Sequence, residues 1–404
     1  MPEVQDNVRE AVFWGGGAVS WRMLGAPLAA FATLLGVAGG ETIRGTVSDR
    51  GGRALAGIEV RLLGPREAAE AARPRIASAT SDGEGRFALA ADRTAAKLIE
   101  LAGPQGAGRV RVETSAAPLA LVYPVRATVV LLHDNDHHFN FNHREAVAAK
   151  IDAIRSRHRH VFLLSAGDVF IRHANLWNEP SPEFYARQSR GIIAEMNAFG
   201  YDAMTLGNHE LDYIDDLTRE ALAQARFPLL SANVTVSTDR LPQPQPYTVL
   251  TTDNDLTVAV LGLSVANPKE GVAMRDAIEA AREFLPLADE HDVFVALTHI
   301  GYRTDRRLAE AVDRFDVIIG GHSHTLLEEA EVVGGVLVAQ AGGTAADRPN
   351  PVDPARPRYL GKVVLVLENG AVVEKRGRVF TFTGDPSAEG DRGGTPALSG
   401  AGAE

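Results

Sequence analysis

The chain has 404 residues, a length that allows two or three domains. Of these residues 45% are apolar and 23% are charged, a composition that is ordinary for a soluble globular protein. Its net charge of −11 argues against a nucleic-acid polymer as a partner, because affinity for a phosphate backbone needs a basic surface. An anionic small substrate remains compatible with this charge if bound cations supply positive charge locally. Cysteine is absent, which excludes disulfides, thiolate metal ligands and cysteine nucleophiles.

Residues 1–40 contain a candidate signal peptide or membrane anchor. Arg22 precedes an apolar stretch, residues 23–38, that is shorter than the roughly 20 residues of a membrane span but suits a signal-peptide core. The leading residues 1–21 are long for such a signal and include acidic side chains, so an uncleaved anchor helix is the alternative. We therefore expect an exported protein, periplasmic or extracellular, either cleaved or tethered to a membrane through this segment.

Residues 41–125 predict a small all-β sandwich domain. Alternating polar and apolar residues in TIRGTV and IEVRLL are typical of strands, and SDRGGR and SDGEGR are glycine-rich turns. About fifty residues of this region resemble the carboxypeptidase-regulatory-like β-sandwich module. That resemblance implies a spacer or stabilising module without catalytic residues.

Residues 126–382 follow a different pattern. Apolar runs such as ATVVLL, HVFLLS and VFVALT alternate with helical stretches such as REAVAAKIDAIRSR. Strands that are apolar on both faces predict a layered α/β domain with helices packed outside the sheets. Residues 383–404 are rich in Gly, Pro and Ala and predict a disordered tail.

Polar side chains follow five of the apolar runs, and all twelve histidines lie between His133 and His324. A single Asp after a strand is usually a turn or cap residue, and a single His is usually a core or surface residue. The carboxyl ends of strands in an open α/β sheet meet at one ligand crevice, so the coincidence of five clusters predicts one site. The clusters contribute Asp136 and His138; Asp168; Asn208, His209 and Asp212; His299; and His322 and His324.

These blocks, in the order D-x-H, GD, GNHE, H and GHSH, resemble the signature of the calcineurin-like metallophosphoesterases. The finer text, such as AEMNAFGYDAMTLGNHELD and GGHSHT, is similar to the 5'-nucleotidase branch of that family. The resemblance runs from about residue 127 to 379 and implies an α/β/β/α sandwich. It also implies a dinuclear site for two divalent metal ions, for which nitrogen and oxygen ligands without sulfur suit Zn, Mn or Fe.

Ligand roles follow from the resemblance. The first metal would be held by Asp136, His138 and His324, the second by Asn208, His299 and His322, and Asp168 would bridge both. Alternation along an extended segment is expected to put Asp136 and His138 on one side and His137 on the other. His133 and His137 are expected to make supporting hydrogen bonds, and the other histidines, at 143, 158, 160, 173 and 291, to be solvated.

His209 has a different role by the same resemblance. It would stabilise or protonate the leaving oxygen, with Asp212 orienting its ring from one turn away if a helix begins here. The simpler alternative for Asp212 is an acid in the first turn of a helix.

The implied function is hydrolysis of small phosphate esters by attack of a metal-bridging hydroxide, with nucleotides as the leading substrate class. The sequence VFIRHANLW after the GD block differs from the loop usual in the family. The nucleoside-clamping domain of full-length bacterial 5'-nucleotidases is not matched in this sequence. Phosphoester hydrolysis is therefore the firmer expectation. The alternatives are a cyclic-nucleotide phosphodiesterase or a sulfur-ester hydrolase on the same fold, or a non-catalytic exported binding module.

Overall fold

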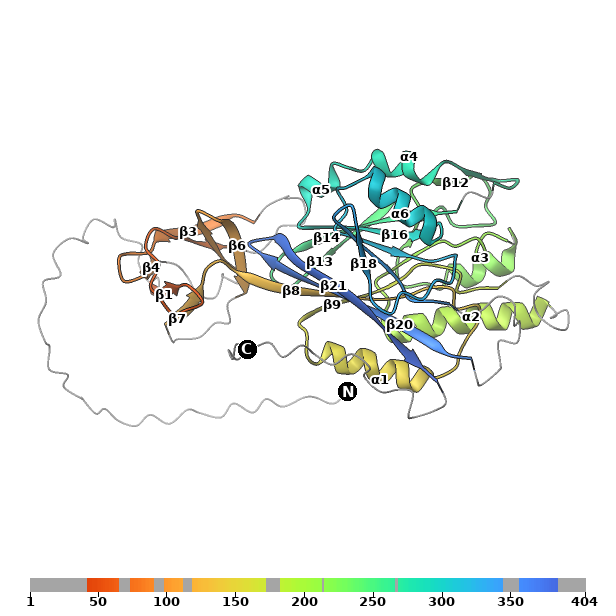
Figure 1. Cartoon of the computed structure of the whole chain (residues 1–404), viewed down its shortest axis with the longest axis horizontal. Coiled ribbons are helices and arrows are strands. Elements are labelled where there is room, and N and C mark those ends of the chain that lie inside the picture. Colours follow the sequence, from red (N-terminus) through yellow and green to blue (C-terminus); the bar gives the residue numbers. More distant parts are fainter. Residues whose placement is uncertain are drawn as a thin grey trace, which may run out of the picture. The chain divides into compact units, whose positions relative to one another are not determined.

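The computed structural model describes residues 42–64, 73–90, 98–111, 118–171, 182–212, 214–265, 268–343 and 356–383. The described residues after position 125 include two six-stranded sheets (Figure 1). The first sheet has the order β11 (Leu229–Leu230), β10 (Ala203–Thr205), β9 (His160–Ser165), β8 (Arg126–Asp134), β20 (Arg358–Glu368) and β21 (Ala371–Phe382). The second has the order β13 (Tyr247–Thr251), β14 (Thr257–Ser264), β16 (Val293–His299), β17 (Val317–Gly320), β19 (Val336–Gln340) and β18 (Glu331–Val333).

The strands that carry the predicted site run parallel to their neighbours. In the first sheet β8, β9, β10 and β11 are parallel, and β20 and β21 close the sheet in antiparallel pairing. In the second sheet β14, β16, β17 and β19 are parallel, with β13 and β18 antiparallel at the edges. Parallel pairing places the carboxyl ends of β8, β9 and β10 at one edge, and those of β16 and β17 at one edge of the other sheet.

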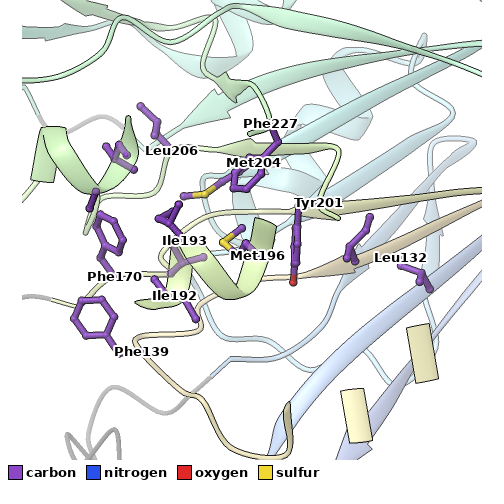
Figure 2. Packing of buried hydrophobic residues seen from close by; sticks show 14 of the residues in the cluster. Leu132, Phe139, Phe170, Ile192, Ile193, Met196, Tyr201, Met204, Leu206 and Phe227 are labelled. Atoms are coloured by element: carbon purple, nitrogen blue, oxygen red, sulfur yellow. The ribbon is translucent and has the colours of Figure 1, made fainter. Parts of the chain in front are cut away.

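Helices cover the outer face of the first sheet. They are α1 (Arg144–Arg155), α2 (Pro182–Phe199) and the short α3 (Asp216–Leu222). Ile192, Ile193 and Met196 of α2 pack in one buried cluster with Leu132 of β8 and Met204 of β10 (Figure 2). The apolar periodicity of the α2 sequence therefore serves to bury this face of the sheet.

The second sheet is covered in the same way on its own outer face, and the two inner faces pack together. Ala280 of α4 (Ala277–Arg282) and Leu308 of α6 (Tyr302–Ala311) pack against Phe294 of β16, and α5 (Leu287–Glu290) lies between these helices in sequence. Leu131 of β8 and Leu297 of β16 share the cluster between the sheets. The order helix, sheet, sheet, helix confirms the predicted α/β/β/α fold class.

Residues 42–122 contain two smaller all-β sheets around a core of their own. One has the order β4 (Arg86–Ala90), β1 (Thr42–Ser48) and β7 (Leu119–Val122); the other has β3 (Arg75–Thr80), β2 (Glu59–Leu63), β5 (Leu98–Gly103) and β6 (Gly106–Arg111). Val47, Val60 and Leu101 are fully buried in this core. The resemblance to the carboxypeptidase-regulatory-like module and the predicted domain boundaries stay predictions.

The predicted leader, residues 1–40, and the predicted tail after Thr383 lie outside the described residues. Among the helices that the structure does describe, none combines the length and the apolar character needed to cross a membrane.

Candidate metal centre

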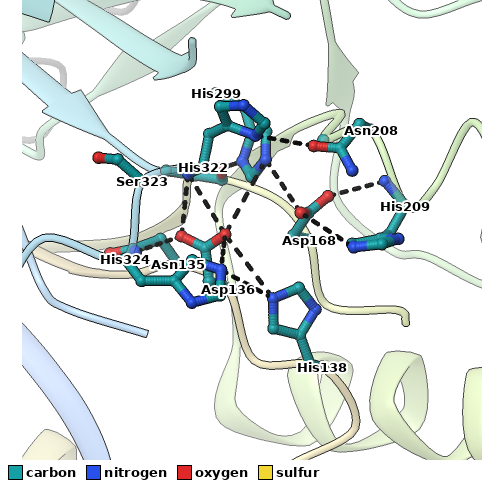
Figure 3. Close-up of polar contacts among 12 residues, drawn as sticks. Asn135, Asp136, His138, Asp168, Asn208, His209, His299, His322, Ser323 and His324 are labelled. Atoms are coloured by element: carbon teal, nitrogen blue, oxygen red, sulfur yellow. Dashed lines mark hydrogen bonds and ion pairs between the residues drawn. The ribbon is translucent and has the colours of Figure 1, made fainter. Parts of the chain in front are cut away.

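The structure brings all five polar clusters to the carboxyl ends of the parallel strands (Figure 3). Asp136 and His138 follow β8, Asp168 follows β9, and Asn208 and His209 follow β10. From the second sheet, His299 is the last residue of β16, and His322 and His324 follow β17. Residues separated by nearly 190 positions along the chain thus share one site, as the strand-end argument predicts.

The donor atoms fall into three overlapping groups, each with its atoms within 4.8 Å of one another. The groups are Asp136, His138 and His324; His138, Asp168 and His209; and Asp168, His299 and His322. Asn208 adjoins the third group, because its Oδ1 lies 2.8 Å from Nδ1 of His322. The chemistry of this donor set, imidazole nitrogens with carboxylate and amide oxygens, fits a divalent transition-metal ion.

Backbone carbonyl groups determine which ring nitrogen donates a hydrogen bond in two of the histidines. Nδ1 of His299 lies 2.7 Å from the carbonyl oxygen of Ala166, and Nδ1 of His138 lies 2.9 Å from that of Phe170. A carbonyl only accepts, so Nδ1 is the donor in both rings and Nε2 is the atom directed into the site. Nε2 of His299 is buried without a hydrogen-bond partner, although Oδ2 of Asp168 is 3.1 Å away. Such a fixed and unsatisfied nitrogen is what a metal ligand requires.

Burial and charge oppose each other strongly at this centre. Burial lowers the pKa of His138 to about 4, so this imidazole is neutral and able to ligate near neutral pH. Burial also works to lower the pKa of His299, but the charge of Asp168 and its hydrogen bond, together with the charge of Asp136, raise this pKa to about 10. Asp168 is fully buried, yet the charge of His299 keeps the pKa of its carboxyl below the ordinary value. A divalent cation would compete with the His299 proton for the same lone pair.

The loops at the centre use left-handed backbone conformations. Asp136, His138, Asp168, His322 and His324 have φ angles of 52°, 49°, 54°, 78° and 53°. Such values are uncommon for non-glycine residues and concentrate at functional sites. The expected extended alternation through Asp136 and His138 is therefore wrong, because both residues are left-handed. The two side chains nevertheless converge, and His137 turns away to place its Nε2 2.7 Å from Oδ2 of Asp134.

His209 and Asp212 form a close pair. Nδ1 of His209 lies 2.5 Å from Oδ2 of Asp212, while Nε2 of His209 lies 3.9 Å from Oδ2 of Asp168. Burial works to lower the pKa of His209, but the hydrogen bond to Asp212 and the charge of Asp168 raise it above its ordinary value. The conditional expectation of a helix starting here is wrong, because α3 begins at Asp216 with Asp215 as its N-cap, and the pair forms across a turn instead.

Glu210 and Asn135 support the centre and were not assigned a role from the sequence. Glu210 is fully buried and accepts hydrogen bonds from the backbone N–H groups of Gly207, Asp168 and Phe170. Nδ2 of Asn135 donates to Oδ2 of Asp136 at 2.6 Å. Glu210 was visible as the last letter of the GNHE block, whereas Asn135 carried no signal that separated it from its neighbours.

The remaining histidines divide between burial and partial exposure. His133 and His137 are buried, and His137 makes the expected supporting bond to Asp134. The expectation of a solvated His160 is wrong: it lies at the start of β9 with 9% exposure, and its Nδ1 is 3.4 Å from Asp253. His173 lies outside the described residues.

Two packed sheets with a cluster of carboxylates and imidazoles at their strand ends make this a layered α/β domain with a candidate metal centre. The calcineurin-like phosphoesterase family model matches residues 130–326. Residues 130–326 therefore form a calcineurin-like metallophosphoesterase domain, and the resemblance predicted from the motifs is confirmed for these residues.

Relatives found by sequence and by structure include nucleotide phosphoesterases by name. The chain is 33% identical over 293 residues to the trifunctional nucleotide phosphoesterase protein YfkN of Bacillus subtilis, covering 61% of this chain and 18% of that protein. It is 30% identical over 268 residues to snake venom 5'-nucleotidase of Crotalus adamanteus, covering 60% of this chain and 43% of that protein. The crystal structure of a 5'-nucleotidase precursor from Thermus thermophilus superposes with a TM-score of 0.53 at 28% identity, covering 65% of this chain and 55% of that chain. The chain thus spans about half or less of the length of these relatives.

Proposed function

We propose that the protein hydrolyses small phosphate esters, with nucleotides as the leading substrate class, and that two divalent ions (Zn, Mn or Fe) are its cofactors. The observation that carries the proposal is the position of Asp168. Its carboxylate belongs to the donor group that contains His322 and the fixed, unsatisfied Nε2 of His299, and it also lies within 4.8 Å of the donor nitrogen of His138, a proposed ligand of the other ion. A carboxylate shared between two ligand sets is the arrangement of dinuclear phosphoesterases.

The proposed ligand sets are those expected from the sequence. Asp136, His138 and His324 hold one ion; Asn208, His299 and His322 hold the other; and Asp168 contacts both. When bound, two dications supply Lewis acidity toward the phosphoryl group and its attacking water. They also account for an anionic substrate binding to a protein with a net charge of −11.

His209 is assigned to the leaving group rather than to a metal. Its Nδ1 is occupied by Asp212, so only Nε2 is available to the site. A cationic ring has a proton on Nε2, and Nε2 donates it to the leaving oxygen as the P–O bond breaks. The raised pKa of His209 supports a protonated ring near neutral pH.

Export to the periplasm or the extracellular space, with the leader cleaved or retained as an anchor, is part of the proposal. It rests on the composition of residues 1–40, which lie outside the described part of the chain.

Turnover by purified protein tests the function. The protein is freed of metal with a chelator, loaded with Mn²⁺ or Zn²⁺, and assayed for phosphate release from nucleoside monophosphates, simple phosphomonoesters and phosphodiesters. We expect metal-dependent release from phosphomonoesters, with nucleoside monophosphates among the turned-over substrates. Metal bound in full with no turnover of any compound would overturn the enzyme assignment in favour of a binding module.

A further inference from the structure

Lys269 lies against the pair formed by His209 and Asp212. Its Nζ donates to Oδ1 of Asp212 at 3.2 Å and to the carbonyl oxygen of Leu211 at 2.8 Å. Nδ1 of His209 contacts the other carboxylate oxygen, Oδ2, so each oxygen of Asp212 has a different partner. The carboxylate therefore cannot rotate without breaking one of these contacts.

The lysine is itself held in place. Its backbone N–H donates to the carbonyl of Val272 and its carbonyl accepts from the N–H of Val272, at 3.0 and 2.9 Å. Val272 begins β15 (Val272–Met274), which pairs with β12 (Val234–Val236). The side chain of Lys269 is 26% exposed and that of Asp212 is 10% exposed, so their interaction is partly shielded from water. Partial burial makes such an ion pair stronger than a surface pair.

We propose that Lys269 is a positioning residue for the leaving-group step, acting on His209 through Asp212. This inference rests on the proposed function for its kinetic consequence, but the contact itself does not. By fixing both the carboxylate and the backbone carbonyl of Leu211, Lys269 holds the turn that aims the Nε2 atom of His209. A small displacement of a proton donor from its target is enough to reduce turnover severely.

Leaving groups of different basicity provide the kinetic test. Lys269→Met keeps much of the side-chain volume and removes the charge and the donors. We expect kcat for a nucleoside 5'-monophosphate, whose alkoxide needs a proton to leave, to fall about tenfold. For p-nitrophenyl phosphate, whose phenolate leaves without one, kcat should be unchanged, and KM and metal content should be unchanged for both. Lys269→Arg, which retains charge and donors, should recover most of the loss.

Lys375→Met is the matched control. Lys375 is also half-buried and its Nζ also donates to a backbone carbonyl, that of Asp316 at 3.2 Å. Asp316 precedes β17, so this contact lies at the amino end of the strand whose carboxyl end carries the site. The variant should retain turnover of both substrates. An equal loss on both leaving groups in Lys269→Met, or no loss on either, would overturn the positioning role.

A spectroscopic readout separates this inference from the proposed function. In full-length protein labelled with ¹⁵N-histidine, the Nδ1 proton of His209 should give a strongly downfield NMR resonance, assigned by its absence in His209→Ala. The resonance should move or broaden in Lys269→Met and stay in Lys375→Met. If wild-type protein hydrolyses neither substrate, the proposed function fails while this measurement still decides the positioning role; an unchanged resonance in Lys269→Met contradicts it.

Discussion

Asp168 has more contacts with the other site residues than a turn residue needs. One carboxylate oxygen accepts from the backbone N–H of His209 at 2.8 Å, and the other lies 3.1 Å from Nε2 of His299. The carboxylate thus connects the GNHE turn of the first sheet to the end of β16 in the second. A residue with this position is expected to affect both proposed metal sites at once.

Asp168→Asn should weaken the binding of both ions together, because an amide replaces a shared charge with a neutral oxygen. Metal analysis after dialysis should show the loss of both equivalents. Asp202→Asn is the control, since Asp202 accepts from the backbone N–H of Leu163 away from the centre. Two full equivalents retained by Asp168→Asn would refute the shared role.

His209→Ala separates proton donation from metal binding. The metal content should stay near that of the wild type, and kcat for a nucleoside monophosphate should fall by roughly 10²- to 10⁴-fold, the usual range for a general acid. Because His209 also lies in a donor group with His138 and Asp168, loss of an ion from this variant would reassign it as a ligand.

At the scale of elements, the turn after β10 packs directly against the loop after β9. A Cβ built on Gly207 would lie 2.6 Å from the backbone nitrogen of Asp168 and closer still to its carboxylate. The glycine is required here by close approach, since its backbone is not in the left-handed region.

Gly207→Ala should therefore displace Asp168 and reduce metal affinity and turnover, although it replaces none of the proposed ligand side chains. Isothermal titration with Mn²⁺ measures the affinity. Gly83→Ala is the matched control, because nothing lies within 4 Å of a Cβ at that position. Equal metal affinity for Gly207→Ala and the wild type would show that the loops after β9 and β10 can move apart without weakening metal binding.

Asp305 links α6 to the end of the second sheet. It is fully buried in the first turn of α6, and Oγ1 of Thr298 in β16 donates to its Oδ1 at 2.6 Å. Burial raises the pKa of this carboxyl to about 7, from an ordinary value of 3.8. The folded protein therefore holds this proton more tightly than the unfolded chain does.

The sign of the pH effect on stability follows from that difference. The stabilisation is complete below the unfolded pKa and is lost as pH rises through about 7, with a slope of at most about 1.4 kcal/mol per pH unit. Asp305→Asn removes this titration. Denaturant unfolding of both metal-free proteins between pH 5 and 8 should show the wild type losing stability relative to the variant. Parallel curves would mean that Asp305 is ionised throughout.

At the scale of the whole molecule, the fold class and the gathering of the strand-end polar side chains were predictable for the same reason. Strands buried on both faces leave apolar runs in the sequence, and the polar groups that follow Leu132, Leu164 and Leu297 contrast with them locally. Parallel topology then brings such strand ends together without further information.

Features that depend on contacts between distant segments were not predictable. The left-handed backbone at Asp136 and His138 is fixed by the loops around them, so the expected extended geometry failed. Lys269 reaches Asp212 from 57 positions away, and His160 is buried through contacts that its polar neighbours in sequence do not indicate. Contacts between residues so far apart leave no repeating pattern or fixed spacing in a single sequence from which they could be predicted.

The proposed function depends most directly on two ions acting in one site. Mn²⁺ or Zn²⁺ is titrated into metal-free protein while phosphate release from a nucleoside monophosphate is recorded at each addition. We predict that activity rises to a plateau at two equivalents of metal per chain. Full activity at one equivalent, or activity without added metal, would contradict the dinuclear centre.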